Sequence, residues 1–192
     1  MATVIQVAGD TNGFKQDVLG SDGRMNVSSR ADSRSYYNSR DAGQAYSLVW
    51  EMTNAIDTPE YVAYLQNTST SGKQIVIDAI GVNSELAATF ELLYVTGTAA
   101  AGTVVTPTNL NATSSNAATA NGREGGSAAT GITGLTAGAI VDRARCTALG
   151  HEEFRLDDRV RLGQNDAVAI RMKLTASSAE CDVDGVIFFF FE

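Results

Sequence analysis

The segment Ala167-Val168-Ala169-Ile170-Arg171-Met172-Lys173-Leu174 carries its larger apolar side chains at every second position. Val168, Ile170, Met172 and Leu174 would share one face of a β-strand, with two basic residues on the other. A period of two with one polar face is typical of an antiparallel sheet that is covered on one side and solvated on the other.

The same pattern extends along the chain on both sides of this segment. Upstream, Phe154, Leu156, Val160 and Leu162 alternate with charged residues, and Asp158 interrupts the apolar face, which predicts a bend or bulge. Downstream, one face of a last strand would hold every second residue from 181 to 191: Cys181, Val183, Gly185, Ile187, Phe189 and Phe191. Three consecutive strands are therefore expected in the C-terminal third.

The central part of the chain contains further apolar runs of strand length. Residues 45–52 and 61–66 are apolar at nearly every position, which predicts strands covered on both faces. In residues 73–82, strict alternation would place Ile75, Ile77 and Ala79 on one face. The opposite face of that strand would carry Val76, Ile80 and Val82, and residues 89–95 follow with a similar run.

These strands predict an all-β fold. Turn-forming residues such as 67–72 separate them, only two prolines occur in the chain, and no amphipathic helix of ten residues is visible. Many short strands between turns favour an antiparallel β-sandwich or jelly roll, with the strand order left open. We expect an extended N-terminal arm over residues 1–43 and one sandwich domain over 44–192, with an insertion at about 97–136.

Composition narrows the classes of function. The 192 residues carry a net charge of −8, whereas nucleic-acid-binding domains usually have a basic excess. The longest apolar run, residues 186–191, is far shorter than the roughly 20 residues of a membrane-spanning helix. The N-terminus shows no signal-peptide pattern, so synthesis in a cytoplasm is expected. Neither nucleic acid nor a membrane is a predicted partner.

The residues of common catalytic and metal sites are scarce. Only one histidine is present, His151, and the second histidine of an H-E-x-x-H zinc motif would fall at Arg155. Residues 97–103 have the spacing of a phosphate-binding loop, but Thr103 replaces its lysine, and residues 182–185 lack the next ligand of a calcium loop. We therefore expect no catalytic residue, no metal and no cofactor. Cys146 and Cys181 are expected to be buried free thiols.

The predicted N-terminal arm combines arginine and tyrosine, which are enriched at interface hot spots. The side chains expected to contact a partner are Arg24, Arg30, Arg34, Tyr36, Tyr37 and Arg40. A solvated, frayed terminus is the alternative interpretation of the same residues.

The predicted insertion is built almost wholly of Gly, Ala, Ser, Thr and Asn. Loops of this length are uncommon in compact domains and are usually functional or disordered. Small side chains would also let the loop pack closely against neighbouring subunits, anchored by apolar residues at Val104, Val105, Leu110, Ile132 and Leu135. Disorder remains the alternative.

Most other basic residues lie on the late strands, where cross-strand ion pairs on a solvated sheet face are the expected role. They are Arg143, Arg145, Arg155, Arg159, Arg161, Arg171 and Lys173.

Four segments of the chain resemble short stretches of small virion proteins from tailed bacteriophages: residues 24–40, 64–71, 106–111 and 161–166. Within that group the chain looks most like the jelly-roll decoration, or cement, proteins. The resemblance implies a non-enzymatic protein on the capsid exterior, often trimeric, whose arm bridges subunits of the major capsid protein. The alternative is a tail-fibre or baseplate sandwich that binds a host-surface glycan, although Trp50, the sole tryptophan, lies within an apolar run. A hydrolase on a sandwich scaffold is a third hypothesis.

Overall fold

The structure, a computed structural model, describes residues 37–55, 58–126, 131–175 and 180–192. The predicted contact residues Arg24, Arg30, Arg34 and Tyr36 lie outside them, as does the side chain of Arg40. The described residues form a short π-helix and eleven strands: η1 (Asn38–Ala42), β1 (Ala45–Ala55), β2 (Glu60–Asn67), β3 (Ile75–Ser84), β4 (Ala88–Ala100), β5 (Thr103–Val105), β6 (Thr108–Asn109), β7 (Ala120–Glu124), β8 (Thr133–Cys146), β9 (Gly150–Leu162), β10 (Ala167–Leu174) and β11 (Cys181–Phe191).

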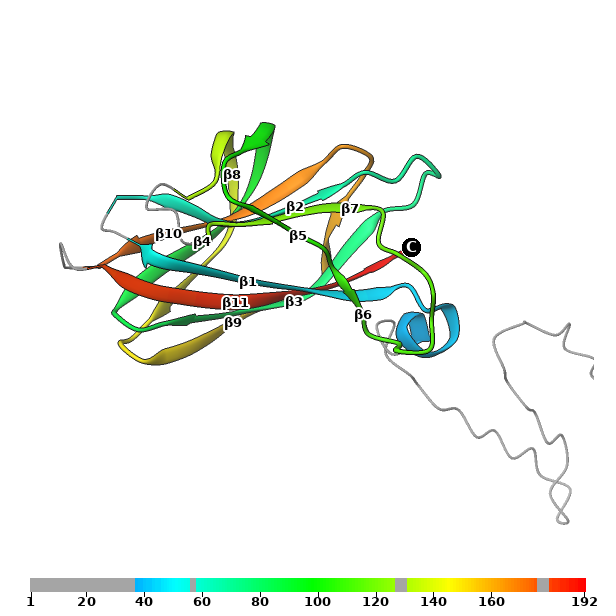
Figure 1. The fold of residues 1–192 in the computed structure, drawn as a ribbon, viewed down its shortest axis with the longest axis horizontal. Helices are drawn as coiled ribbons and strands as arrows, with labels where there is room; N and C mark the ends of the chain where they lie inside the picture. The colour runs from blue at the N-terminus through cyan, green and yellow to red at the C-terminus, as the bar shows by residue number, and fades with distance from the viewer. Residues whose placement is uncertain (1–36, 56–57, 127–130, 176–179) are drawn as a thin grey trace, which may run out of the picture. The chain divides into compact units, whose positions relative to one another are not determined.

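The strands form two antiparallel sheets that pack face to face as a sandwich (Figure 1). Sheet A has the order β6-β1-β11-β3-β9, and sheet B has the order β5-β7-β2-β10-β4-β8. Without the short strands β5, β6 and β7, the order is β1-β11-β3-β9 in sheet A and β2-β10-β4-β8 in sheet B. Nearly every connection between consecutive strands of this set crosses from one sheet to the other. This arrangement is the jelly-roll order. The prediction of an antiparallel sandwich or jelly roll is confirmed.

The core lies between the inner faces of the two sheets. Tyr46, Phe189 and Phe191 form an aromatic cluster within it, with ring centroids 5.6–6.0 Å apart. Trp50 is 1% exposed and packs over Gly185, where an added Cβ would come closer than 3.0 Å to the indole ring and to the Gly81 carbonyl oxygen. Gly185 therefore provides the space in which the largest core side chain lies.

The buried faces predicted for the late strands are confirmed, whereas the opposite faces are solvated only in part, because Ala167, Ala169 and Phe190 are buried as well. The apolar positions named above in β9, β10 and β11 are all buried, and Cys146 and Cys181 are buried free thiols. Asp158 has a φ of 61°, and the pairing of β3 with β9 shifts register between Ile77 and Ala79. The interruption expected at Asp158 is therefore a β-bulge.

Two predicted faces are wrong. The bulge beside Asp78 reverses the alternation of β3, so Ile75, Ile77, Ile80 and Val82 are all fully buried. Strand β1 is not covered on both faces, because Val49 on its outer side is 63% exposed.

The predicted insertion adds strands to its own chain. Strands β5 and β7 extend sheet B beyond β2, and β6 pairs with β1 in sheet A. Gly122 and Gly125 lie so close to Leu48 and Met52 that a Cβ at either glycine would clash with these core side chains. The small residues of this segment thus permit close packing within the chain itself.

A second apolar cluster lies apart from the main core and combines residues of β2, β4 and β10 with residues near the start of β8. It contains Tyr64, Leu93, Val95, Ala99, Ile132, Ala167 and Ala169, with Tyr61 and Leu135 packed against it.

Candidate interaction surface

The predicted contact residue that the structure describes is Tyr37, at the N-terminal end of η1. Its side chain is 39% exposed, and η1 packs beside β1 and β11. The last residues of the predicted extended arm therefore form a helical turn against sheet A.

The five apolar residues predicted for subunit contacts do not form one surface. Val104 is 62% exposed and Leu110 is 45% exposed, so both can meet another molecule. Val105 packs against the main core, whereas Ile132 and Leu135 belong to the second cluster. Three of the five therefore contribute to packing within the chain.

Strand β8 forms the outer edge of sheet B, and no described strand pairs with its free side. Most of its fourteen residues are exposed, and Ile140 is 46% exposed. Its first nine residues, 133–141, contain no charge and no proline. Natural proteins usually protect an edge with charges, proline, bulges or short strands. The three register shifts in the pairing of β4 with β8 all fall within residues 133–142, so the first part of β8 is a neutral edge that bulges interrupt.

The other edges are better protected. Strand β9 ends sheet A and carries Glu152, Glu153, Arg155, Arg159 and Arg161 beside its bulge. The remaining edge strands, β5 and β6, are three and two residues long. The first part of β8 is therefore the longest edge segment among the described strands that carries no charged side chain.

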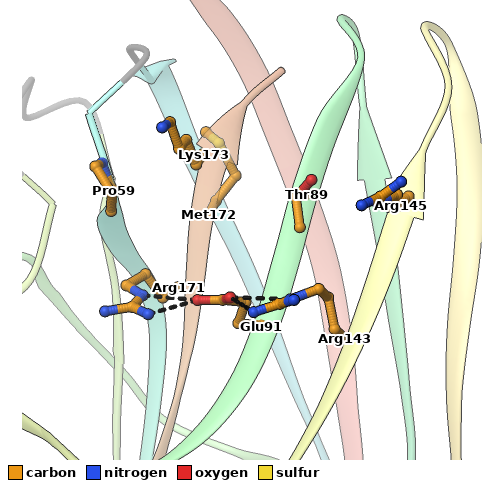
Figure 2. A pocket seen from close by; sticks show the side chains of 8 residues that line it. All are labelled: Pro59, Thr89, Glu91, Arg143, Arg145, Arg171, Met172 and Lys173. Atoms are coloured by element: carbon orange, nitrogen blue, oxygen red, sulfur yellow. Dashed lines mark hydrogen bonds and ion pairs between the residues drawn. The ribbon is translucent and has the colours of Figure 1, made fainter. Parts of the chain in front are cut away.

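Farther along β8 the outer face of sheet B becomes basic. Arg171 of β10, Glu91 of β4 and Arg143 of β8 lie in register across three strands (Figure 2). Arg171 donates to Glu91 Oε2 from Nε at 3.0 Å and from Nη2 at 2.5 Å. Arg143 donates to Oε1 from the same two atoms, also at 3.0 and 2.5 Å. One carboxylate thus holds two guanidinium groups.

The pKa of Glu91 reflects this position. Burial acts to raise the pKa, but the hydrogen bonds and positive charges of Arg171 and Arg143 outweigh it and leave the pKa below its usual value. Glu91 therefore stays ionised at neutral pH.

Cross-strand ion pairs are present for part of the expected set, Arg143, Arg161 and Arg171, with partners that the sequence did not identify, whereas Arg145 and Lys173 form none with the described residues. Arg161 pairs with Glu192 at 2.6 Å, and Arg155 pairs with Glu153 on the same strand. Glu91 lies 52 residues from Arg143 and 80 from Arg171, so local sequence gave no sign of this cluster. The one feature of the sequence that bears on this cluster is that Glu91 is an acidic residue within the predicted strand 89–95.

His151 is exposed on β9, and its Nδ1 lies 2.8 Å from Asn83 Oδ1. The nearby Ser84 hydroxyl donates to the carbonyl oxygen of Leu86.

The described residues contain no cluster of three or more His, Cys, Asp or Glu side chains that could hold a metal ion. They also contain no helix with the length and apolar character needed to cross a membrane.

Comparison with protein-family models, with curated proteins and with solved structures finds no match to this chain.

Proposed function

We propose that the chain is a non-enzymatic structural protein of a tailed-phage particle that binds the capsid exterior as a decoration protein and associates with copies of itself, as a trimer. The phage assignment and the capsid partner rest on the sequence resemblance. The observation in the structure that supports an assembly role is the neutral, unpaired edge of β8.

An open edge favours association because its backbone N–H and C=O groups can pair with a strand of another chain. Residues 133–141 would lose no charged side chain to desolvation when covered. Val104 offers an exposed apolar side chain on β5, at the opposite edge of the same sheet. Many copies on a shell add modest contacts together, so no single contact needs high affinity.

The jelly-roll order is compatible with this role but is not evidence for it, because viral capsid proteins, lectins and cupins share the architecture. For the glycan-binding alternative, Trp50 provides no stacking surface, since its side chain is buried in the core. Specific, saturable binding on a glycan array would favour that alternative.

Self-association can be tested with an edge substitution and a matched control. Ile140→Lys places a charge on the open edge at β8, whereas Phe188→Lys places the same charge on β11, which is paired on both sides. By light scattering after size exclusion we expect the wild type and Phe188→Lys to exceed the 20.2 kDa monomer, and Ile140→Lys to be monomeric. A monomeric wild type would contradict self-association through β8.

The capsid assignment has its own test. Electron microscopy of intact particles should place the sandwich on the outside of the shell. Deletion of residues 1–36, which leaves η1 and all described strands in place, should weaken binding to undecorated capsids. Undiminished binding would exclude the arm as an anchor, and location in the tail would contradict the capsid assignment.

A further inference from the structure

The basic part of sheet B contains a second row of side chains beside the Arg171–Glu91–Arg143 row. Lys173 of β10 pairs in register with Thr89 of β4, and Thr89 pairs with Arg145 of β8 (Figure 2). Each of these residues lies two positions along its strand from a member of the first row, and all six point to the same face. The rows differ in the middle, where a hydroxyl replaces the carboxylate.

This replacement leaves the second row with positive charge that is not compensated. Lys173 and Arg145 are exposed, and neither forms an ion pair with any residue that the structure describes. The two rows together carry four cationic side chains and one carboxylate. Because the whole chain has a net charge of −8, this local excess does not follow from overall composition.

The two rows line a shallow hollow of about 270 Å³, with Met172 and Pro59 in its wall. Arg143 and Arg171 use Nε and Nη2 to hold Glu91, which leaves their Nη1 donors available. The site thus offers an ammonium group, a hydroxyl group and a complete guanidinium group across three adjacent strands. Charge-assisted hydrogen bonds of this kind favour an acceptor with several oxygen atoms.

We propose that Lys173, Thr89 and Arg145, supported by Arg143, form a binding site for an oxyanion group. Phosphate, sulfate and the carboxylate of an acidic side chain on another molecule share the required chemistry. Lys173 and Arg145 supply charge from either side, and the Thr89 hydroxyl donates from the centre. Glu91 fixes the neighbouring guanidinium groups and also lowers the positive potential of the site. The site does not depend on the proposed assembly role.

The experiment is an NMR titration of the backbone amides of the full chain, at an ionic strength held constant with sodium chloride. The probes are inorganic phosphate, sulfate and N-acetylaspartate amide. We expect saturable shifts confined to residues of β4, β8 and β10 around the hollow. Saturation by phosphate or sulfate alone identifies a free tetrahedral anion as the ligand, and saturation by the aspartate derivative identifies a carboxylate of a partner chain.

Variants separate a built site from general attraction to positive charge. Lys173→Gln with Arg145→Gln should weaken binding at least ~10-fold, because two charge-assisted contacts are lost. The control, Lys73→Gln with Arg155→Gln, removes the same charges elsewhere and should leave binding unchanged. Glu91→Gln should strengthen binding, since a negative charge leaves the site.

Shifts that do not saturate, or that weaken equally in the double variant and its control, would overturn the proposal. In that case Arg145 would serve only as a charge that protects the edge of sheet B, and Lys173 only as a solvated charge on its outer face.

Discussion

The side chain of Asn67 lies fully buried at the end of β2 and joins three separate segments. Its Nδ2 donates to the carbonyl oxygens of Lys73 at 2.9 Å and Leu162 at 2.8 Å, and its Oδ1 accepts from the Ser69 N–H at 2.9 Å. A buried amide with three satisfied hydrogen bonds fixes the turn after β2 against the end of β9.

Replacement of Asn67 by alanine should destabilise the fold by about 3 kcal/mol, because two buried carbonyl groups and one N–H lose their partners. Urea unfolding would measure the loss. The control is Asn111→Ala, which removes a similar bond to the Thr113 N–H in an exposed loop and should cost less than ~1 kcal/mol. Equal effects at the two positions would show that burial of Asn67 is unimportant.

Cys146 is a second buried residue with a measurable consequence. Burial first, and then the negative charge of Glu152, raise the pKa of its thiol from 9.0 to about 11, against an opposing backbone hydrogen bond at Glu152. Between these two values the unfolded chain loses the thiol proton while the folded chain keeps it. Stability contributed by this group is therefore complete below pH 9 and falls as the pH rises towards 11.

Urea unfolding at about pH 8 and about pH 10 should show a loss of stability in the wild type that is smaller in Cys146→Ala. The difference between the two proteins should be at most about 1.4 kcal/mol per pH unit. Burial also raises the pKa values of Tyr46 and Tyr64. Their effect on stability is the same in the wild type and in Cys146→Ala, so it cancels when the two proteins are compared at each pH. Identical pH profiles would refute the assignment to Cys146.

At the scale of single elements, the sequence predicts strands well where alternation is unbroken. The faces of β10 and β11 follow from alternation because one side of each contacts the core continuously. The face assignment in β3 fails after Asp78, because a single extra residue in the strand, relative to β11, exchanges its two sides. Strands β5, β6 and β7 were not predicted, since each has five residues or fewer and is too short to show a period of two.

The row across β10, β4 and β8 is an element-scale contact that the sequence could not reveal. It predicts that Glu91→Gln destabilises the protein by about 1–2 kcal/mol at neutral pH, because two guanidinium groups then face each other without a carboxylate between them. The side chain of Glu91 is 15% exposed, so solvent screens this pair less than a surface pair. The same change at Glu153, whose partner Arg155 is 81% exposed, should cost less than ~0.5 kcal/mol.

The pH dependence of this effect has a definite sign. The pKa of Glu91 is lowered on folding, so its contribution is complete above the ordinary value of 4.5 and is lost as the pH falls through the lower value of the folded chain. Denaturant unfolding of the wild type and Glu91→Gln should therefore give curves that differ at neutral pH and converge in acid. A difference that persists unchanged at low pH would contradict the ionic origin.

At the scale of the whole molecule, local sequence cannot give the strand order, because the pairs that define it are distant. Ala45 of β1 pairs with Phe190 of β11, and β11 lies between β1 and β3 at the centre of sheet A. Turn signals show where strands end but not which strands meet. For the same reason, the open edge of β8 was found only in the structure, since an edge is defined by the whole sheet.

This distant pairing predicts slow, cooperative folding. Sheet A cannot close until the last strand joins the first, so the entropy of ordering most of the chain opposes formation of the core. We expect refolding on the scale of ~10 ms to seconds in a stopped-flow experiment. Trp50 is the only tryptophan and lies on β1 opposite Gly185 of β11, so its fluorescence reports closure of this pair. Strand β11 joins β1 to β3 and so connects the two parts of sheet A. If both sheets form in one cooperative step, fluorescence and far-ultraviolet circular dichroism should change with the same rate constant. A circular dichroism change that is complete before the fluorescence change would show that sheet structure forms without the β1–β11 pair and would contradict this order of events.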